Sequence, residues 1–177
     1  GVALGGILGM MLAIPLTASA APREQGQWYV SPKVGYGWSD DDRLTSDGVL
    51  FGLGMGFVYR TNWTFEGELG YISYDRDVGV DEPLDWRQLS VGVAVRHLWD
   101  YGHHHPYIGF GVGTARTELR GAGEDDWGLQ AGPIVGFEWD ISDSGALRIE
   151  VGHKFTDFDN GAIDTRFWDT TASIGYS

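Results

Sequence analysis

Apolar residues alternate with polar residues or glycine along much of the chain, and this two-residue period is the feature that most restricts the possible folds. Leu147, Ile149 and Val151 are separated by Arg148 and Glu150. Successive side chains of a β-strand point to opposite faces, so this segment has one apolar face and one ionic face. A soluble sandwich would bury the apolar face. So many strands with an ionic second face instead favour a membrane barrel, with lipid outside and charge inside.

The pattern predicts eight strands joined by connections of alternating length. Short connections are expected at residues 60–62, 100–105 and 142–145, and longer acidic ones at 40–48, 75–85, 120–126 and 157–165. Outer-membrane barrels have short turns on one side and longer loops on the other. We therefore expect an all-β fold, an eight-stranded antiparallel up-and-down transmembrane β-barrel. Its strands are expected at residues 28–39, 49–59, 63–74, 86–99, 106–119, 127–141, 146–158 and 166–176.

The two faces of the expected strands can be compared residue by residue. In the segment 127–141, Leu129, Val135 and Phe137 share one face, while Gln130 and Glu138 share the other, and Ile134 is the only residue out of character. The segment 49–59 has glycine at every other position from 52 to 56. An eight-stranded barrel has barely enough interior for side chains, so a strand that faces a bulky Glu, Arg or Lys is expected to be slim.

The charge of the chain lies mostly in one set of connections. The four long connections, the last extended to Arg166, carry formal charges of −3, −4, −2 and −2, which is −11 of the chain's −13. An acidic protein is unsuited to binding nucleic acid, whose phosphates require a basic surface. The chain contains no cysteine, which excludes thiol chemistry and cysteine-based metal sites.

The N-terminal segment has the composition of a signal peptide. Residues 1–15 are almost wholly apolar and too short for a membrane-spanning helix, and Ala18-Ser19-Ala20 supplies small residues suited to signal peptidase. We therefore expect a signal peptide at residues 1–20, with its beginning missing, and one barrel domain at 21–177.

Aromatic residues gather at the ends of the expected strands, as they do in the two interfacial belts of membrane proteins. The expected belt at the short turns contains Trp28, Phe57, Tyr59, Trp63, Phe65, Trp99, Tyr107, Phe137, Trp139 and Tyr176, and the other contains Tyr36, Trp38, Tyr71, Trp86, Phe155 and Trp168.

The mature sequence resembles the OmpA-like eight-stranded outer-membrane barrels. The resemblance lies in QWYVSPKVGYGWSDDD, GLGMGFVYR, FEGELGY, GPIVGFEWDIS followed by ALRIEVGHKF, and the last strand TTASIGYS. It implies inward acids and bases that form ion pairs across the lumen and can open transiently. Many members also carry a C-terminal peptidoglycan-binding domain, which makes peptidoglycan an expected partner if such a domain follows Ser177 in the complete protein.

The resemblance assigns inward charges by motif. Glu68 of FEGELGY, Glu138 of GFEW, and Arg148 and Glu150 of LRIE match the inward charges of the family. The family's lysine in the fourth strand falls near Gly92, so Arg96 or Lys33 would have to supply that positive charge. The parity of the strands also turns these residues inward, and the full set of expected lumen ion-pair residues is Glu68, Glu138, Arg148, Glu150, Lys33, Lys154 and Arg96.

Other clusters carry weaker chemical signals. His103-His104-His105 could bind a transition metal, but adjacent residues in a turn converge poorly on one ion, so a solvated turn is the expectation. Asp40-Asp41-Asp42 with Asp47 lacks the ligand order of a calcium loop. His153 near Thr156 and Asp157 is a faint acid/base signal. No cofactor or metal is expected.

The sequence features lead to three alternative functions. The leading hypothesis is a non-enzymatic protein of the Gram-negative outer membrane, a monomer in contact with membrane lipid and lipopolysaccharide, with a structural or surface-interaction role and at most a narrow gated pore. The alternative is a barrel enzyme that acts on lipid A as an acyltransferase or deacylase, which would need a lipid-sized cavity. A soluble lipocalin-like carrier would have the reverse arrangement, with an apolar interior and a polar exterior.

Overall fold

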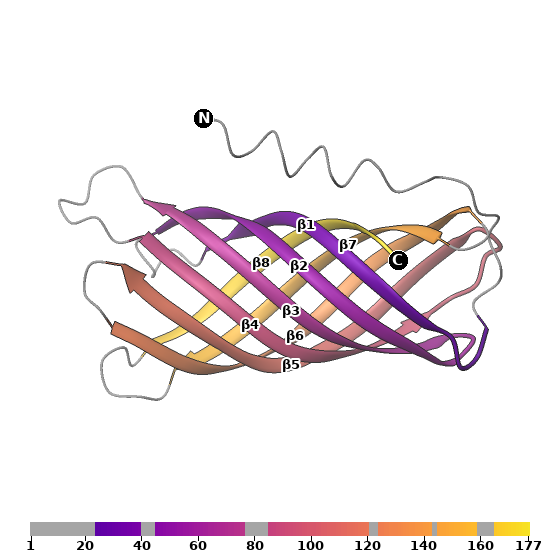
Figure 1. Cartoon of the computed structure of the whole chain (residues 1–177), viewed down its shortest axis with the longest axis horizontal. Helices are drawn as coiled ribbons and strands as arrows, with labels where there is room; N and C mark the ends of the chain where they lie inside the picture. The colour runs from indigo at the N-terminus through magenta and orange to yellow at the C-terminus, as the bar shows by residue number, and fades with distance from the viewer. Residues whose placement is uncertain (1–23, 40–44, 77–84, 121–123, 143–144, 159–164) are drawn as a thin grey trace.

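The described residues form one closed barrel of eight antiparallel strands. The computed structural model describes residues 24–39, 45–76, 85–120, 124–142, 145–158 and 165–177. Each strand pairs with its neighbours in sequence, and β1 pairs with β8 to close the barrel (Figure 1). The fold class expected from the sequence is confirmed. The strands are β1 (Trp28–Trp38), β2 (Thr45–Arg60), β3 (Trp63–Arg76), β4 (Asp85–Leu98), β5 (His104–Arg120), β6 (Glu124–Ser142), β7 (Gly145–Phe158) and β8 (Thr165–Tyr176).

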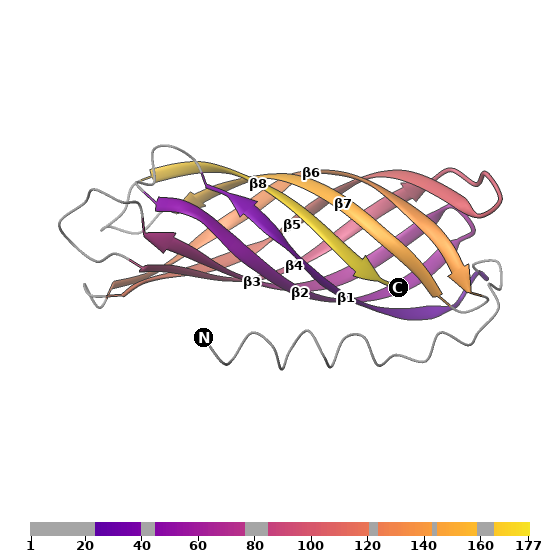
Figure 2. The same ribbon diagram turned by 90° about the horizontal axis from the view of Figure 1, so that it is seen from above.

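The barrel has two distinct ends. We call the end at which β1, β3, β5 and β7 finish the loop end, and the opposite end the turn end; the strands run between them at a tilt to the barrel axis (Figures 1 and 2). At the turn end, the connection between β4 and β5 is closed by Asp100, whose Oδ1 accepts a hydrogen bond from the Gly102 amide at 3.0 Å. Gly102 has a φ of 77°, which a residue without a side chain adopts most easily.

The strands extend further toward the loop end than expected. The ladder between β5 and β6 continues to the pair Leu119 and Glu124, so the expected loop at 120–126 was too long. β2 likewise begins at Thr45 rather than at Val49. Backbone pairing tolerates polar side chains above the lipid, so the end of the apolar pattern does not mark the end of the strand. Residues 1–20 and the aspartates at 40–42 lie outside the described residues.

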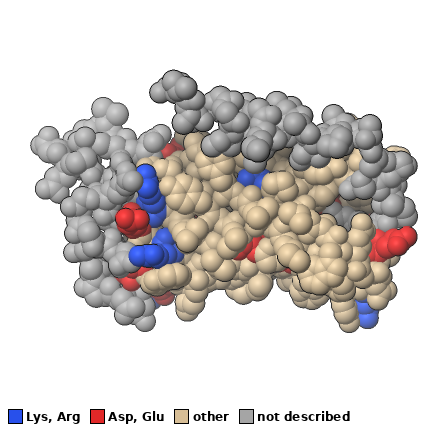
Figure 3. Space-filling view, viewed as in Figure 1, with Lys and Arg blue, Asp and Glu red and all other residues tan. Residues whose placement is uncertain are grey.

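The outer face of the barrel is apolar along its middle. Val93 is 60% exposed and Leu129 is 71% exposed. Most of the other exposed apolar residues likewise stand at every second position of their strands. Figure 3 shows a largely uncharged middle, with charged residues toward both ends and the larger group of them near the loop end. The described residues include no helix that is long and apolar enough to cross a membrane. Because the apolar side chains face outward and charged ones inward, the lipocalin-like alternative is wrong.

Aromatic residues pack together near both ends of the outer face. At the turn end the Trp28 and Phe57 rings lie 5.1 Å apart, and at the loop end the Phe155 and Trp168 rings lie 4.9 Å apart. The assignment of Tyr107 to the turn-end belt was wrong: its side chain is 2% exposed and points into the barrel, because Ile108 takes the outward position. The side chain of Trp86 lies outside the described residues.

The interior combines a small apolar cluster with charged side chains and glycines. Ile134, the exception to the polar parity of β6, packs with Ala94, Leu98 and Tyr107. Glycine makes room for the charged side chains, as expected. A Cβ atom at position 54 would lie 2.3 Å from Oε1 of Glu66, so a larger residue there would displace this carboxylate.

An arginine on the middle of the outer face should destabilise the barrel. Val93 lies between Gly67 and Val112 on the neighbouring strands, so its side chain faces lipid. We expect Val93→Arg to lower the free energy of unfolding in lipid bilayers by about 2–4 kcal/mol. Urea titration of the folded protein in vesicles measures this, with Val93→Leu as the control. Equal stability of the arginine and leucine variants would show that this face does not contact the hydrocarbon.

Candidate functional site

The charged side chains that form a network of ion pairs in the lumen come from five strands. Alternation along each strand turns Lys33 of β1, Glu66 and Glu68 of β3, and Arg96 of β4 toward the barrel axis. The same alternation turns inward Glu138 of β6 and the group Arg148, Glu150 and Lys154 of β7. All seven residues expected from the sequence therefore face the lumen, and Glu66 joins them.

Arg148 is the centre of the contacts nearest the turn end. Its Nε donates a hydrogen bond to Oε1 of Glu138 at 2.6 Å, and its Nη1 donates to Oε2 of Glu66 at 2.7 Å. Nη1 also lies 3.3 Å from the hydroxyl of Ser31. The guanidinium carbon is 5.4 Å from the centre of the Tyr29 ring, within the range of a cation–π contact. Arg148 is 1% exposed, so its charge is balanced inside the barrel and not by solvent.

Arg96 occupies the middle of the lumen and contacts three carboxylates. Its Nε and Nη2 donate to Oε2 of Glu150 at 3.0 and 2.8 Å. Nη2 also pairs with Glu68, and Nη1 lies 3.4 Å from Oε2 of Glu66. The hydroxyl of Tyr107 donates a further hydrogen bond to Oε2 of Glu150 at 3.0 Å. A planar guanidinium suits such multiple contacts because its donors point in several fixed directions.

The two lysines lie on the side of Arg96 toward the loop end. Nζ of Lys33 contacts Oε1 of Glu68 at 2.9 Å and Oε1 of Glu150 at 3.2 Å. Nζ of Lys154 lies 3.9 Å from Oε2 of Glu68. The resemblance left either Arg96 or Lys33 to supply the positive charge beside Glu68, and the structure uses both.

These contacts form a single network because Oε2 of Glu66 lies within ion-pair distance of both Arg148 and Arg96. The network contains four cations and four carboxylates, so its formal charges cancel. The pair of Arg148 and Glu66 joins β7 to β3, which are four strands apart in either direction around the eight-stranded barrel. The network therefore crosses the full width of the lumen.

The network is held by burial and by its charge balance. Transfer of an isolated charge into a protein interior costs several kcal/mol, and paired, hydrogen-bonded charges recover this cost only with good geometry. Each carboxylate here contacts at least one cation within 4 Å. Removal of one member would leave its partners buried without compensation.

Sequence reasoning missed two members of the site. Glu66 stands two residues before Glu68, so strand parity alone could have placed it in the lumen, but the comparison of motifs transferred only Glu68. Tyr107 was assigned to the outer belt by its place near a turn, although its parity on β5 matches that of the inward residues Gly109 and Gly111. Parity was the better guide in both cases.

A cavity of about 40 Å³ lies next to the network, lined by Lys33, Glu68, Gln88, Gln130, Lys154 and Thr171, among others. This volume has room for a few water molecules but not for an acyl chain.

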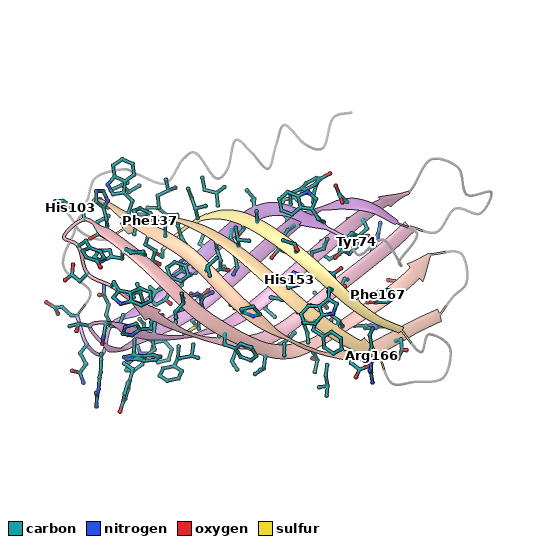
Figure 4. All side chains as sticks on the ribbon, turned by 180° about the vertical axis from the view of Figure 1, so that it is seen from behind. Tyr74, His103, Phe137, His153, Arg166 and Phe167 are labelled. Carbon is teal, nitrogen blue, oxygen red and sulfur yellow. The ribbon has the colours of Figure 1, made fainter. Side chains whose placement is uncertain are left out.

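The histidines are distributed over different surfaces. Nε2 of His105 lies 2.9 Å from Oδ2 of Asp140 near the turn end, whereas the His104 ring packs 5.6 Å from that of Trp139. The ring of His153 stacks on that of Trp168 on the outer face, with 4.9 Å between the ring centres. Figure 4 labels His153 on this side of the barrel. Thr156 faces the interior, so His153 and Thr156 do not form the acid/base group considered from the sequence.

None of the described residues form a group of three or more His, Asp or Glu side chains that could hold a metal ion. His104 and His105 also make separate contacts, the first with the Trp139 ring and the second with Asp140. The described geometry thus assigns His104 to packing and His105 to a hydrogen bond at the turn end.

The outward apolar face and inward charge are features of outer-membrane barrels. The family described as "Outer membrane protein beta-barrel domain" matches residues 7–177. The chain belongs to this family. It is an integral protein of the Gram-negative outer membrane, and the long connections of such barrels face the cell exterior.

Three of the solved structures that are similar to this barrel are surface or outer-membrane proteins of Neisseria, Pseudomonas and Yersinia. The chain is similar to Neisserial surface protein A, with 16% identity, a TM-score of 0.68, and coverage of 86% of this chain and 97% of the other. It is similar to OprG of Pseudomonas aeruginosa, with 14% identity, a TM-score of 0.57, and coverage of 88% and 97%. It is also similar to Ail of Yersinia pestis, with 16% identity, a TM-score of 0.50, and coverage of 86% of this chain and 99% of the other. At these identities the similarity shows the fold alone. No curated protein sequence is detectably similar to the chain.

Removal of the central cation of the turn-end contacts should destabilise the barrel. Arg148→Ala leaves Glu138 and Glu66 without their shortest ionic contact, and we expect a loss of about 3–5 kcal/mol in the free energy of unfolding. Urea titration in vesicles measures the loss. Arg60→Ala, at an exposed position of the turn end, is the control and should change stability little.

A second variant separates charge from packing. Arg148→Met combined with Glu138→Gln removes one cation and one carboxylate, so the remaining charges still cancel and Glu66 keeps its contact with Arg96; this variant should recover much of the lost stability. If Arg148→Ala were as stable as the Arg60→Ala control, the network would not contribute to stability as described.

Proposed function

We propose that the protein is a non-enzymatic barrel that supports the outer membrane or presents its loops at the cell surface, and that its lumen is closed at rest. In this proposal the ion-pair network is a plug, and any pore is narrow and opens only when the pairs rearrange. In this proposal the barrel acts as a monomer, and every charge of the network has a partner within one chain.

The observation that carries this proposal is the contact between Arg148 and Glu66 at 2.7 Å. Because β7 and β3 lie on opposite walls, a direct contact between their side chains leaves little space for an ion at that level. Arg96 adds a second crossing from β4 to Glu150 of β7. An ion that passed through the lumen would have to displace both arginines from their carboxylates.

The interior also supports a non-enzymatic role. A lipid A acyltransferase or deacylase needs a cavity for an acyl chain beside its catalytic groups. The inward positions of the described strands carry ion pairs, other polar residues, glycines and buried apolar side chains, and the neighbouring cavity of about 40 Å³ has room for only a few water molecules. The proposal therefore assigns no catalytic step to the barrel.

Planar-bilayer recordings test the plug. We expect the unmodified barrel to conduct few ions, in rare and short openings. Glu68→Gln together with Glu150→Gln removes two carboxylates that hold Lys33 and Arg96, so we expect more frequent openings and a changed selectivity between cations and anions. Removal of either connection between β1 and β2 or between β3 and β4 should have a smaller effect.

A matched control removes the same charge from the outer face. Asp47→Asn together with Glu118→Gln changes two carboxylates near the loop end without touching the network, and should leave the conductance of the barrel unchanged. A large and constant conductance in the unmodified barrel, insensitive to the substitutions at Glu68 and Glu150, would contradict the proposal.

A further inference from the structure

Arginines occupy the outer face of the barrel near its loop end. Arg87, Arg116 and Arg166 stand at outward positions of β4, β5 and β8. Arg116 lies directly opposite Trp127 on β6, and Arg166 lies directly opposite Asp157 on β7. Figure 4 shows Arg166 close to the ends of the strands on this side of the molecule. Outward arginines at the border of an apolar band lie at the depth of lipid headgroups.

A groove opens on the same face between these arginines. It has a volume of about 290 Å³ and is lined by Thr114, Trp127, Gly128, Leu129 and Asp157. The indole of Trp127 is 53% exposed, so one of its faces is available to a flat ligand. Leu129 continues the groove toward the apolar middle of the barrel. Thr114 and Asp157 lie directly opposite Leu129 on the two neighbouring strands, so the lining combines polar and apolar side chains.

The positions of the arginines suit a ligand with two anionic groups. Arg116 on β5 and Arg166 on β8 are three strands apart, which is about 14 Å across the sheet. Arg166 contacts Asp157 at 3.6 Å in an exposed ion pair. Such surface pairs are weak, so this guanidinium can turn to a phosphate at little cost. An arginine binds a phosphate with two parallel hydrogen bonds.

We infer that the outer face of β5–β8 binds a bisphosphorylated glycolipid of the outer leaflet, with its phosphates at Arg116 and Arg166 and a sugar ring in the groove. A ring with several hydroxyl groups can stack on the Trp127 indole and donate hydrogen bonds to Asp157 and Thr114. The acyl chains then follow Leu129 and the apolar face below it. This site is independent of the proposed lumen plug, because the side chains of Thr114, Trp127, Leu129 and Asp157 that line the groove face outward.

The polar lining and the leaflet favour a glycolipid over a phospholipid. A glycerophospholipid has one phosphate and no ring to stack on the indole. The loop end lies on the outer side of the membrane, so the groove opens to the outer leaflet. Two phosphates at opposite ends of a disaccharide match a pair of cations separated by several strands.

Native mass spectrometry of the full chain in detergent tests the site. The probe is bisphosphorylated hexaacyl lipid A, with EDTA present so that no divalent cation bridges phosphate to the acidic groups. We expect Arg116→Gln with Arg166→Gln to weaken binding about tenfold or more. Trp127→Ala, which keeps both charges, should also weaken it. The control Arg60→Gln removes an exposed arginine at the opposite end of the barrel and should bind lipid A as the unmodified chain does.

Three further probes distinguish the sources of affinity. We expect dephosphorylated lipid A and phosphatidylglycerol to bind at least about tenfold more weakly than lipid A, and inorganic pyrophosphate not to displace it. Equal binding of lipid A by the double arginine variant and by Arg60→Gln would overturn the inference. So would equal affinity for phosphatidylglycerol, or full displacement by pyrophosphate, which would indicate a site for free phosphate. Each variant is shown to be folded if its heat-modifiable migration in SDS–polyacrylamide gels equals that of the unmodified chain.

Discussion

The ion pair of Arg148 and Glu66 determines how the rest of the barrel is built. It joins two strands on opposite walls at 2.7 Å, so the lumen at this level has room for little else. Because both charges are buried, their neighbours must complete the charge balance, and Glu138, Arg96 and Glu150 do so within one network. The strands that face these long side chains carry small residues, as Gly54 does beside Glu66. The composition of the interior follows from this one constraint.

The membrane allows this arrangement. A soluble protein of this size must bury its apolar side chains in its interior. In a membrane barrel the apolar side chains contact lipid on the outer face, so the interior can hold polar groups. The closed sheet pairs backbone N–H and C=O groups by hydrogen bonds between strands, which lipid cannot provide. Stability therefore has two separate sources, the contact of the outer face with lipid and the pairing of charges in the lumen. A substitution on one face can be tested with little effect on the other, since alternate residues of the same strand serve the two.

Strand parity predicted most of the fold and the residues that line the lumen, because alternation along a strand is a local property. The partners of each charge were not predictable in this way. Which carboxylate Arg96 meets depends on the stagger between strands that are far apart in the sequence, and a two-residue period contains no information on stagger. The lengths of β5 and β6 at the loop end were underestimated for a related reason. Backbone pairing, such as that of Leu119 with Glu124, continues beyond the end of the apolar pattern. Ile134 could be recognised in the sequence as an exception to the polar parity of β6. Its contact with Tyr107 could not be predicted, because it depends on how the strands close into a barrel.

A double-mutant cycle between Arg148 and Glu66 tests most directly whether a charge pair across the lumen holds the barrel together. The free energies of unfolding in vesicles are compared for the unmodified chain, Arg148→Met, Glu66→Gln and the double variant. Direct contact of the two charges predicts a coupling energy of about 1–3 kcal/mol, so that the double variant loses less than the two single variants combined. Additive losses, with a coupling energy near zero, would show that the two side chains do not act as a pair and would contradict the account of a closed, charge-balanced lumen.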